Sequence, residues 1–150
     1  MQISQEEIHF RGTFMSLFID IEWVLTESLS TILVGDTFIK MNFLEFISPN
    51  LLLDKKITII KSILKKKQPL LLETYKETFE DLRKLVNLRN SFAHKRIEIN
   101  MQSKQLFFLG VDNCRINKSP NTFDDLNEKY EKLKVILVRL NSLHQDIVAI

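Results

Sequence analysis

The chain has 150 residues, 45% hydrophobic and 27% charged, and its net charge of +2 leaves the question of a polyanionic partner open. This length and composition predict one globular domain over residues 1–150, large enough to form a core without a disulfide framework or structural metal. The single cysteine, Cys114, excludes an internal disulfide, and the first residues lack an export signal. No apolar run approaches the length of a membrane span, which is about 18 residues. We therefore expect a cytoplasmic protein with no membrane partner.

The first predicted helix covers about residues 4–34. Its apolar residues recur at intervals of three and four, which is typical of a helix with one buried stripe: Phe14, Leu17, Phe18, Ile21, Val24, Leu25, Leu29 and Ile32. Gly35 and Asp36 predict its end. The aromatic-rich stretch 38–48 that follows is compatible with either a short helix or an ordered loop.

Pro49 and Asn50 precede a second predicted helix over about residues 51–67. It keeps apolar residues at helical spacing (Leu53, Ile57, Ile60, Ile63 and Leu64), while its lysines take other positions (Lys55, Lys56, Lys61 and Lys65 to Lys67). A lysine run of this kind is either an RNA-facing patch or, more commonly, a solvated helix face.

Pro69 suits the first turn of a third helix, predicted to end near Arg96, and a final helix is expected from Phe123 to Ile147. Between them, residues 97–100 and 105–109 are β-branched or aromatic runs that predict a hairpin, and residues 119–122 predict a break. The expected fold is all-α: an antiparallel four-helix bundle with a small β-hairpin between the third and last long helices.

The third helix carries an unusual set of polar residues near its end. Arg83, Asn87, Asn90 and His94 are spaced by four, three and four residues and therefore form one polar stripe. Arg89 falls instead on the apolar stripe, where a permanent charge needs a partner. The first helix offers Asp20, Glu22 and Glu27 as carboxylates, and we predict that Glu22 is the partner.

Two interpretations of this helix end remain open. In the structural one, Arg89 forms a core ion pair and His94 caps the last carbonyls of the helix. In the functional one, Arg89 holds a phosphate and His94 transfers a proton. The two side chains point about 140° apart with a rise of about 7.5 Å, so they flank a groove that a second copy of the helix can close. The other histidines, His9 and His144, are expected to be ordinary surface or cap residues.

Residues 88–94, with the sequence Leu-Arg-Asn-Ser-Phe-Ala-His, resemble the Arg-Asn-x-x-Ala-His form of the Arg-x4-6-His motif of the HEPN superfamily (higher eukaryotes and prokaryotes nucleotide-binding). The layout is similar too: a long first helix with an acidic residue, Glu22, a lysine-rich second helix, the motif at the end of the third and a closing helix. The resemblance implies a HEPN-type four-helix bundle that dimerises with its two motifs facing each other.

The resemblance also implies a metal-independent endoribonuclease without a cofactor, cleaving RNA by attack of the 2′-hydroxyl. In this family Arg89 would bind the scissile phosphate, Asn90 would orient phosphate or ribose, and His94 would assist proton transfer. Members act as toxins of toxin–antitoxin or abortive-infection (antiviral defence) systems, restrained by a cognate antitoxin protein, or are catalytically inactive modules that bind RNA, nucleotide or a partner protein. Arg96 stands where one subgroup has a modified tyrosine; it is either a second phosphate contact, if the helix continues, or a surface charge.

Overall fold

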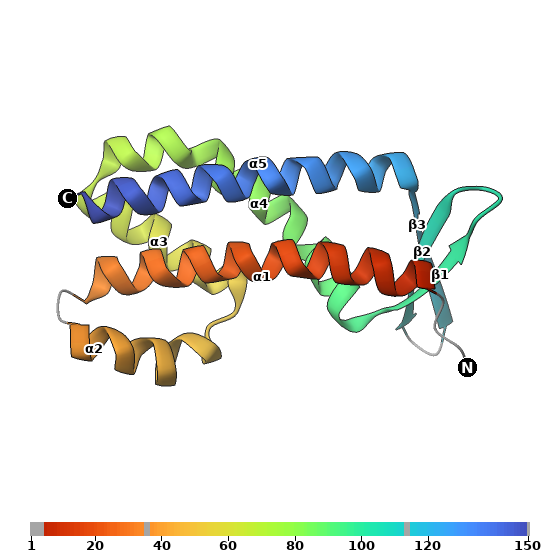
Figure 1. Ribbon diagram of the computed structural model, residues 1–150, viewed down its shortest axis with the longest axis horizontal. Helices are drawn as coiled ribbons and strands as arrows, with labels where there is room; N and C mark the ends of the chain where they lie inside the picture. Colours follow the sequence, from red (N-terminus) through yellow and green to blue (C-terminus); the bar gives the residue numbers. More distant parts are fainter. Residues whose placement is uncertain (1–4, 35–36, 113–114, 150) are drawn as a thin grey trace.

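The computed structural model describes residues 5–34, 37–112 and 115–149, so the predicted helix stop at Gly35 and Asp36, and Cys114, lie outside the described residues. Within these ranges the chain forms five α-helices and one three-stranded antiparallel sheet (Figure 1). The helices are α1 (Gln5–Leu33), α2 (Thr37–Asn42), α3 (Leu53–Lys67), α4 (Pro69–His94) and α5 (Phe123–Val148). Helix predominates, as the apolar periodicity predicts.

All four long predicted helices are confirmed, with ends that differ by a few residues. Pro69 occupies the first turn of α4, and the side chain of Thr122 caps α5 by accepting a hydrogen bond from the backbone N–H of Asp125 at 3.1 Å. The stretch after α1 is helical: α2 continues into a π-helical turn (Phe43–Ile47) and a 3-10 turn (Ser48–Asn50). No helix of the described residues is long and apolar enough to cross a bilayer.

The predicted hairpin is confirmed by β1 (Arg96–Asn100) and β2 (Gln105–Asp112), but a third strand, β3 (Arg115–Thr122), extends it. The predicted break at residues 119–122 is therefore wrong, because these residues pair with β2 and place Pro120 opposite Phe107. β3 pairs with β2 alone and lies at an edge of the sheet, where a proline costs no ladder hydrogen bond. An edge strand also needs no apolar alternation, which is why the pattern does not reveal it.

The long helices are not all antiparallel to their neighbours in space, as a simple bundle would be. Phe10 contacts Phe123 and Ser28 contacts His144, so residue numbers rise together along α1 and α5 and the two helices run parallel. Both start at the end of the molecule that carries the sheet (Figure 1). α4 alone runs the opposite way among the four. The reason is that α2 and the turns that follow it run back along α1, so that α3 starts in the same direction as α1. A prediction that considers only the long helices omits this short segment.

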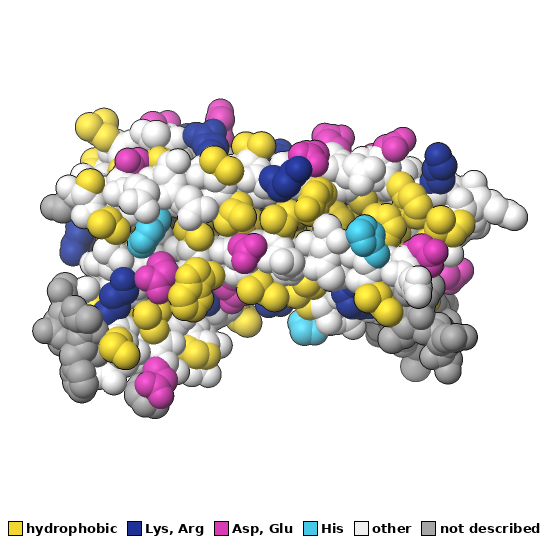
Figure 2. Space-filling model, in the orientation of Figure 1, with side chains coloured by type: hydrophobic (Ala, Val, Ile, Leu, Met, Phe, Trp, Pro, Cys, Tyr) yellow, Lys and Arg dark blue, Asp and Glu magenta, His cyan; other side chains and the backbone are white. Residues whose placement is uncertain are grey.

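The core lies between the long helices and continues into the sheet, and some hydrophobic side chains reach the surface along the line between α1 and α5 (Figure 2). Phe14 of α1 stacks on Phe92 of α4 with ring centroids 4.5 Å apart, and Phe92 meets Phe108 of β2 edge to face at 4.9 Å. All three rings are buried. Since large buried aromatics contribute strongly to packing, this cluster fixes the end of α4, which carries residues 88–94, against α1 and β2.

Candidate functional site

The guanidinium of Arg89 lies between α4 and α1. Its Nη2 atom is 3.6 Å from Oε2 of Glu22, and the two side chains are 26% and 27% exposed. The predicted pairing of Arg89 with Glu22 is therefore confirmed. The other candidate partners point elsewhere: Glu27 pairs with Lys40 at 3.1 Å, and Asp20 is exposed. The apolar stripe of α4 thus faces α1, and Arg89, which lies on that stripe, pairs with Glu22.

Glu22 also pairs with a second cation, Lys56, which the sequence pattern groups with the solvated lysines around it. Nζ of Lys56, on α3, is 3.1 Å from Oε1 of Glu22, and the Lys56 side chain is only 5% exposed. The interpretation of the lysine run as a solvated face is wrong for this residue. The signal was present in the spacing: Lys56 lies three residues after Leu53 and four before Ile60, both buried, so it belongs to the buried stripe of α3.

Arg89 and Asn90 line a cavity of about 200 Å³ whose remaining wall comes mainly from Glu22, Pro49, Asp54 and residues 51–53. Nη1 of Arg89 is 3.4 Å from Oδ1 of Asn90. Nε of Arg89 is buried and has no hydrogen-bond partner. Arg89 is thus held by Glu22 and lines the cavity, and the several N–H donors of a guanidinium suit an anionic ligand with several acceptor oxygens.

His94 is exposed at the last position of α4 and is not among the residues that line this cavity. Its side chain makes no hydrogen bond to the described residues. The expectation that His94 caps the helix is wrong, because Arg11 of α1 donates to the carbonyls of Phe92 and, at 3.0 Å, of Lys95. A longer, always charged side chain from the neighbouring helix thus replaces the local cap.

Arg83, which shares the polar stripe, holds α4 against α3. Its Nε is 3.2 Å from Oδ1 of Asp54, and its Nη2 donates to the Thr58 hydroxyl at 2.9 Å. The stripe itself is confirmed, since Arg83, Asn87, Asn90 and His94 are all exposed. Arg96 starts β1 after the helix has ended at His94, so the expectation that it points the same way as Arg89 along a continued helix is wrong.

The two remaining histidines differ from each other. His9 is exposed on α1, as expected. His144 is half-buried, with Nδ1 3.2 Å from Oγ of Ser28, so it joins α5 to α1 and is not an ordinary surface residue. Neither residue borders the Arg89 cavity.

The clearest pKa shifts lie between α4 and α5, away from Arg89. Burial raises the pKa of Tyr75 to about 12, and the hydrogen bond from its hydroxyl to Oδ2 of Asp146, 2.7 Å long, acts in the same direction. The hydrogen bond from Lys132 lowers the pKa of Asp81, with a further contribution from Lys84. These groups join the antiparallel pair α4 and α5.

Comparison of the chain with models of known protein families, with curated proteins and with solved structures found no match. Within the part of the chain that the structure describes, no three metal-ligating side chains gather in one place. The geometry around Arg89 and the residues of the motif are therefore the basis of the functional proposal.

Proposed function

We propose that the protein is a HEPN-type, metal-independent endoribonuclease that acts as a toxin of a toxin–antitoxin or abortive-infection system. The observation that carries this proposal is the position of Arg89, which Glu22 holds at 3.6 Å on the wall of a cavity that Asn90 also lines. A guanidinium presents several N–H donors in a fixed geometry that matches the oxygens of a phosphate. The bound phosphate is the scissile one in this proposal.

His94 takes part through a second copy of the chain. In one chain Arg89 and His94 do not border a common cavity, but a four-helix bundle that dimerises through the end of α4 brings His94 of one copy to the groove of the other. His94 is exposed and free of hydrogen bonds to the described residues, so its ring is available to take the proton of the 2′-hydroxyl. The 2′-oxygen then attacks phosphorus, the bond to the 5′-oxygen breaks, and that oxygen receives a proton, leaving a 2′,3′-cyclic phosphate and a 5′-hydroxyl.

A second candidate is a catalytically inactive module that binds RNA, a nucleotide or a partner protein. It is favoured by the ion pair between Arg89 and Glu22, which gives the arginine a structural use, and by the net charge of +2, because a general RNA binder usually has a clear basic excess. A ribonuclease directed to one particular RNA by shape needs no such excess.

The decisive experiment incubates the purified protein with total RNA in excess chelator, beside Arg89→Ala, His94→Ala and a control, Arg139→Ala. Arg139 lies on α5 and donates to the carbonyl of Thr74, far along the chain from the motif. Because Lys56 keeps Glu22 paired when Arg89 is removed, Arg89→Ala should cost only about 1 kcal/mol and remain folded by circular dichroism.

We expect cleavage by the wild type and by Arg139→Ala and no cleavage by the other two variants. Full activity of Arg89→Ala or His94→Ala shows that the residue has no catalytic role. Intact RNA with every protein, together with measurable RNA or nucleotide binding, supports the second candidate.

A further inference from the structure

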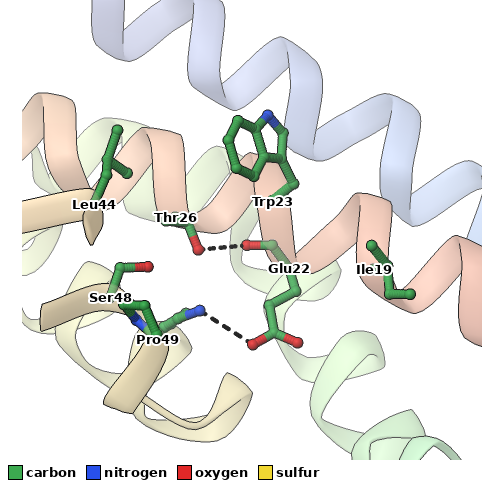
Figure 3. Close-up of a pocket in the computed structure, with 8 residues that line it drawn as sticks. Ile19, Glu22, Trp23, Thr26, Leu44, Ser48 and Pro49 are labelled. Carbon is green, nitrogen blue, oxygen red and sulfur yellow. Dashed lines mark hydrogen bonds and ion pairs between the residues drawn. The ribbon is translucent and has the colours of Figure 1, made fainter. Parts of the chain in front are cut away.

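A second cavity, of about 260 Å³, lies on the other side of Glu22, between α1 and the segment that joins α2 to α3. Its lining includes Ile19, Trp23, Leu44, Ser48 and Lys56. In Figure 3 the indole of Trp23 and the carboxylate of Glu22 project from α1 in different directions. Leu44 and Ser48 lie on the neighbouring segment. Trp23 is 62% exposed, which is a large aromatic surface to leave open to solvent.

The chemistry of this lining favours a flat heteroaromatic ligand. Lys56 is 4% exposed and carries three N–H donors, of which Glu22 accepts one in the described structure. An apolar side chain of another protein, placed in the cavity, would cover this ammonium without giving it an acceptor, which is costly. A nucleobase offers an aromatic face on which Trp23 can stack, and carbonyl or ring-nitrogen acceptors to which Lys56 can donate.

The position of this cavity adds a second argument. It shares Glu22 and Pro49 with the Arg89 cavity, so the two are adjacent. Arg89 and Lys56 together carry two positive charges against one negative charge on Glu22, which leaves an excess of one positive charge between the cavities. Asp54, also in the Arg89 cavity, is paired with Arg83. An unpaired base attached to a phosphodiester places a flat ring and an anion next to each other, which matches the aromatic lining of one cavity and the positive charge between the two.

Resting on the proposed function, we infer that the Trp23 cavity binds one unpaired base of single-stranded RNA while the adjoining phosphate lies against Arg89. The substrate class is then single-stranded RNA or a loop, because a base within a duplex cannot reach the indole. Trp23 is a binding and specificity residue in this arrangement, and Lys56 is the donor that recognises the base edge.

The test uses the fact that Trp23 is the one tryptophan of the chain, so that its fluorescence reports on this cavity alone. The full-length protein is titrated with a fluorescein-labelled 2′-O-methyl oligouridine, which cannot undergo attack by its 2′-oxygen. Anisotropy of the label measures binding, and tryptophan emission measures stacking in an unlabelled parallel titration. Trp23→Ala, the conservative Trp23→Phe and a control, Val138→Ala, an exposed residue of α5, are compared by anisotropy.

We expect tryptophan quenching that saturates with the same midpoint as anisotropy. Trp23→Ala should weaken binding by roughly 5- to 150-fold, the range for one stacked base, while Trp23→Phe retains most of the affinity and Val138→Ala all of it. This inference is overturned if the oligouridine binds without quenching the tryptophan, or if Trp23→Ala binds it as well as the wild type does. The proposed function still stands in that case if the protein cleaves RNA without a metal ion. An oligouridine that does not bind the wild type overturns it as well. Emission that shifts with protein concentration alone identifies a second copy as the occupant and also overturns it.

Discussion

The buried ion pair between Lys56 and Glu22 gives the sharpest prediction for stability. The Lys56 side chain is 5% exposed, so Glu22→Gln leaves an ammonium in the protein interior without its counter-ion. Breaking a buried pair costs about 3–5 kcal/mol. Because Glu22 is 27% exposed and glutamine keeps an acceptor oxygen, the loss should be smaller, about 2 kcal/mol, equivalent to a fall of roughly 4–8 °C in Tm for a domain of this size.

The double variant Glu22→Gln with Lys56→Met separates this cause from a general disturbance of the core. Methionine has a similar length and no charge, and an apolar replacement of a buried pair is often neutral. The double variant should therefore melt higher than Glu22→Gln alone in thermal unfolding followed by circular dichroism. If Glu22→Gln melts within about 1 °C of the wild type, or if the double variant melts no higher than Glu22→Gln alone, the buried charge is not what governs stability here.

Two further predictions concern contacts at the ends of α4. Arg11→Met removes the hydrogen bonds to the carbonyls of Phe92 and Lys95 and should lower the free energy of unfolding by about 1.5–3 kcal/mol, measured by urea denaturation; an unchanged midpoint would mean that water replaces the cap fully. Because the pKa of Tyr75 is raised to about 12 from 10.0, the folded state holds the phenol proton more tightly, so stability is complete below about pH 10 and falls as pH rises toward about 12. Tyr75→Phe should abolish that decline in urea midpoints measured across this range, and a decline that persists places its cause elsewhere.

The sequence predicts the long helices well because each one hides a single stripe in a common core. In α1 the stripe through Phe14, Phe18 and Ile21 is buried as its spacing requires. Proline positions then help to fix the ends, since Pro69 suits a first turn and α4 begins there. The direction of each helix does not follow from such patterns, because it depends on how many passes the intervening segments make, and α2 makes one.

The site is predictable in part for a similar reason. Arg89 is conspicuous because a charge interrupts an apolar stripe, and the partner carboxylate had to come from the neighbouring helix. Lys56 interrupts the stripe of α3 in the same way, but the lysines around it resemble a solvated face and conceal it. The cap provided by Arg11 cannot be read from spacing at all, because it joins residues more than eighty positions apart. The exposure of Trp23 indicates a binding surface only once the cavity beside it is known from the structure.

Glu22 reconciles the structural and functional interpretations of Arg89. One carboxylate shared by two cations orients the guanidinium without neutralising it, and the charge that remains is available to a ligand. Fixed charges that require no rearrangement are the kind that stabilise a developing negative charge most effectively. Because the deeper of the two cations is Lys56, folding depends chiefly on Lys56 and Glu22, while Arg89 can be removed at small cost. In the proposed function, Arg89→Ala should therefore lose RNA cleavage while it remains folded, whereas Glu22→Gln should lose stability.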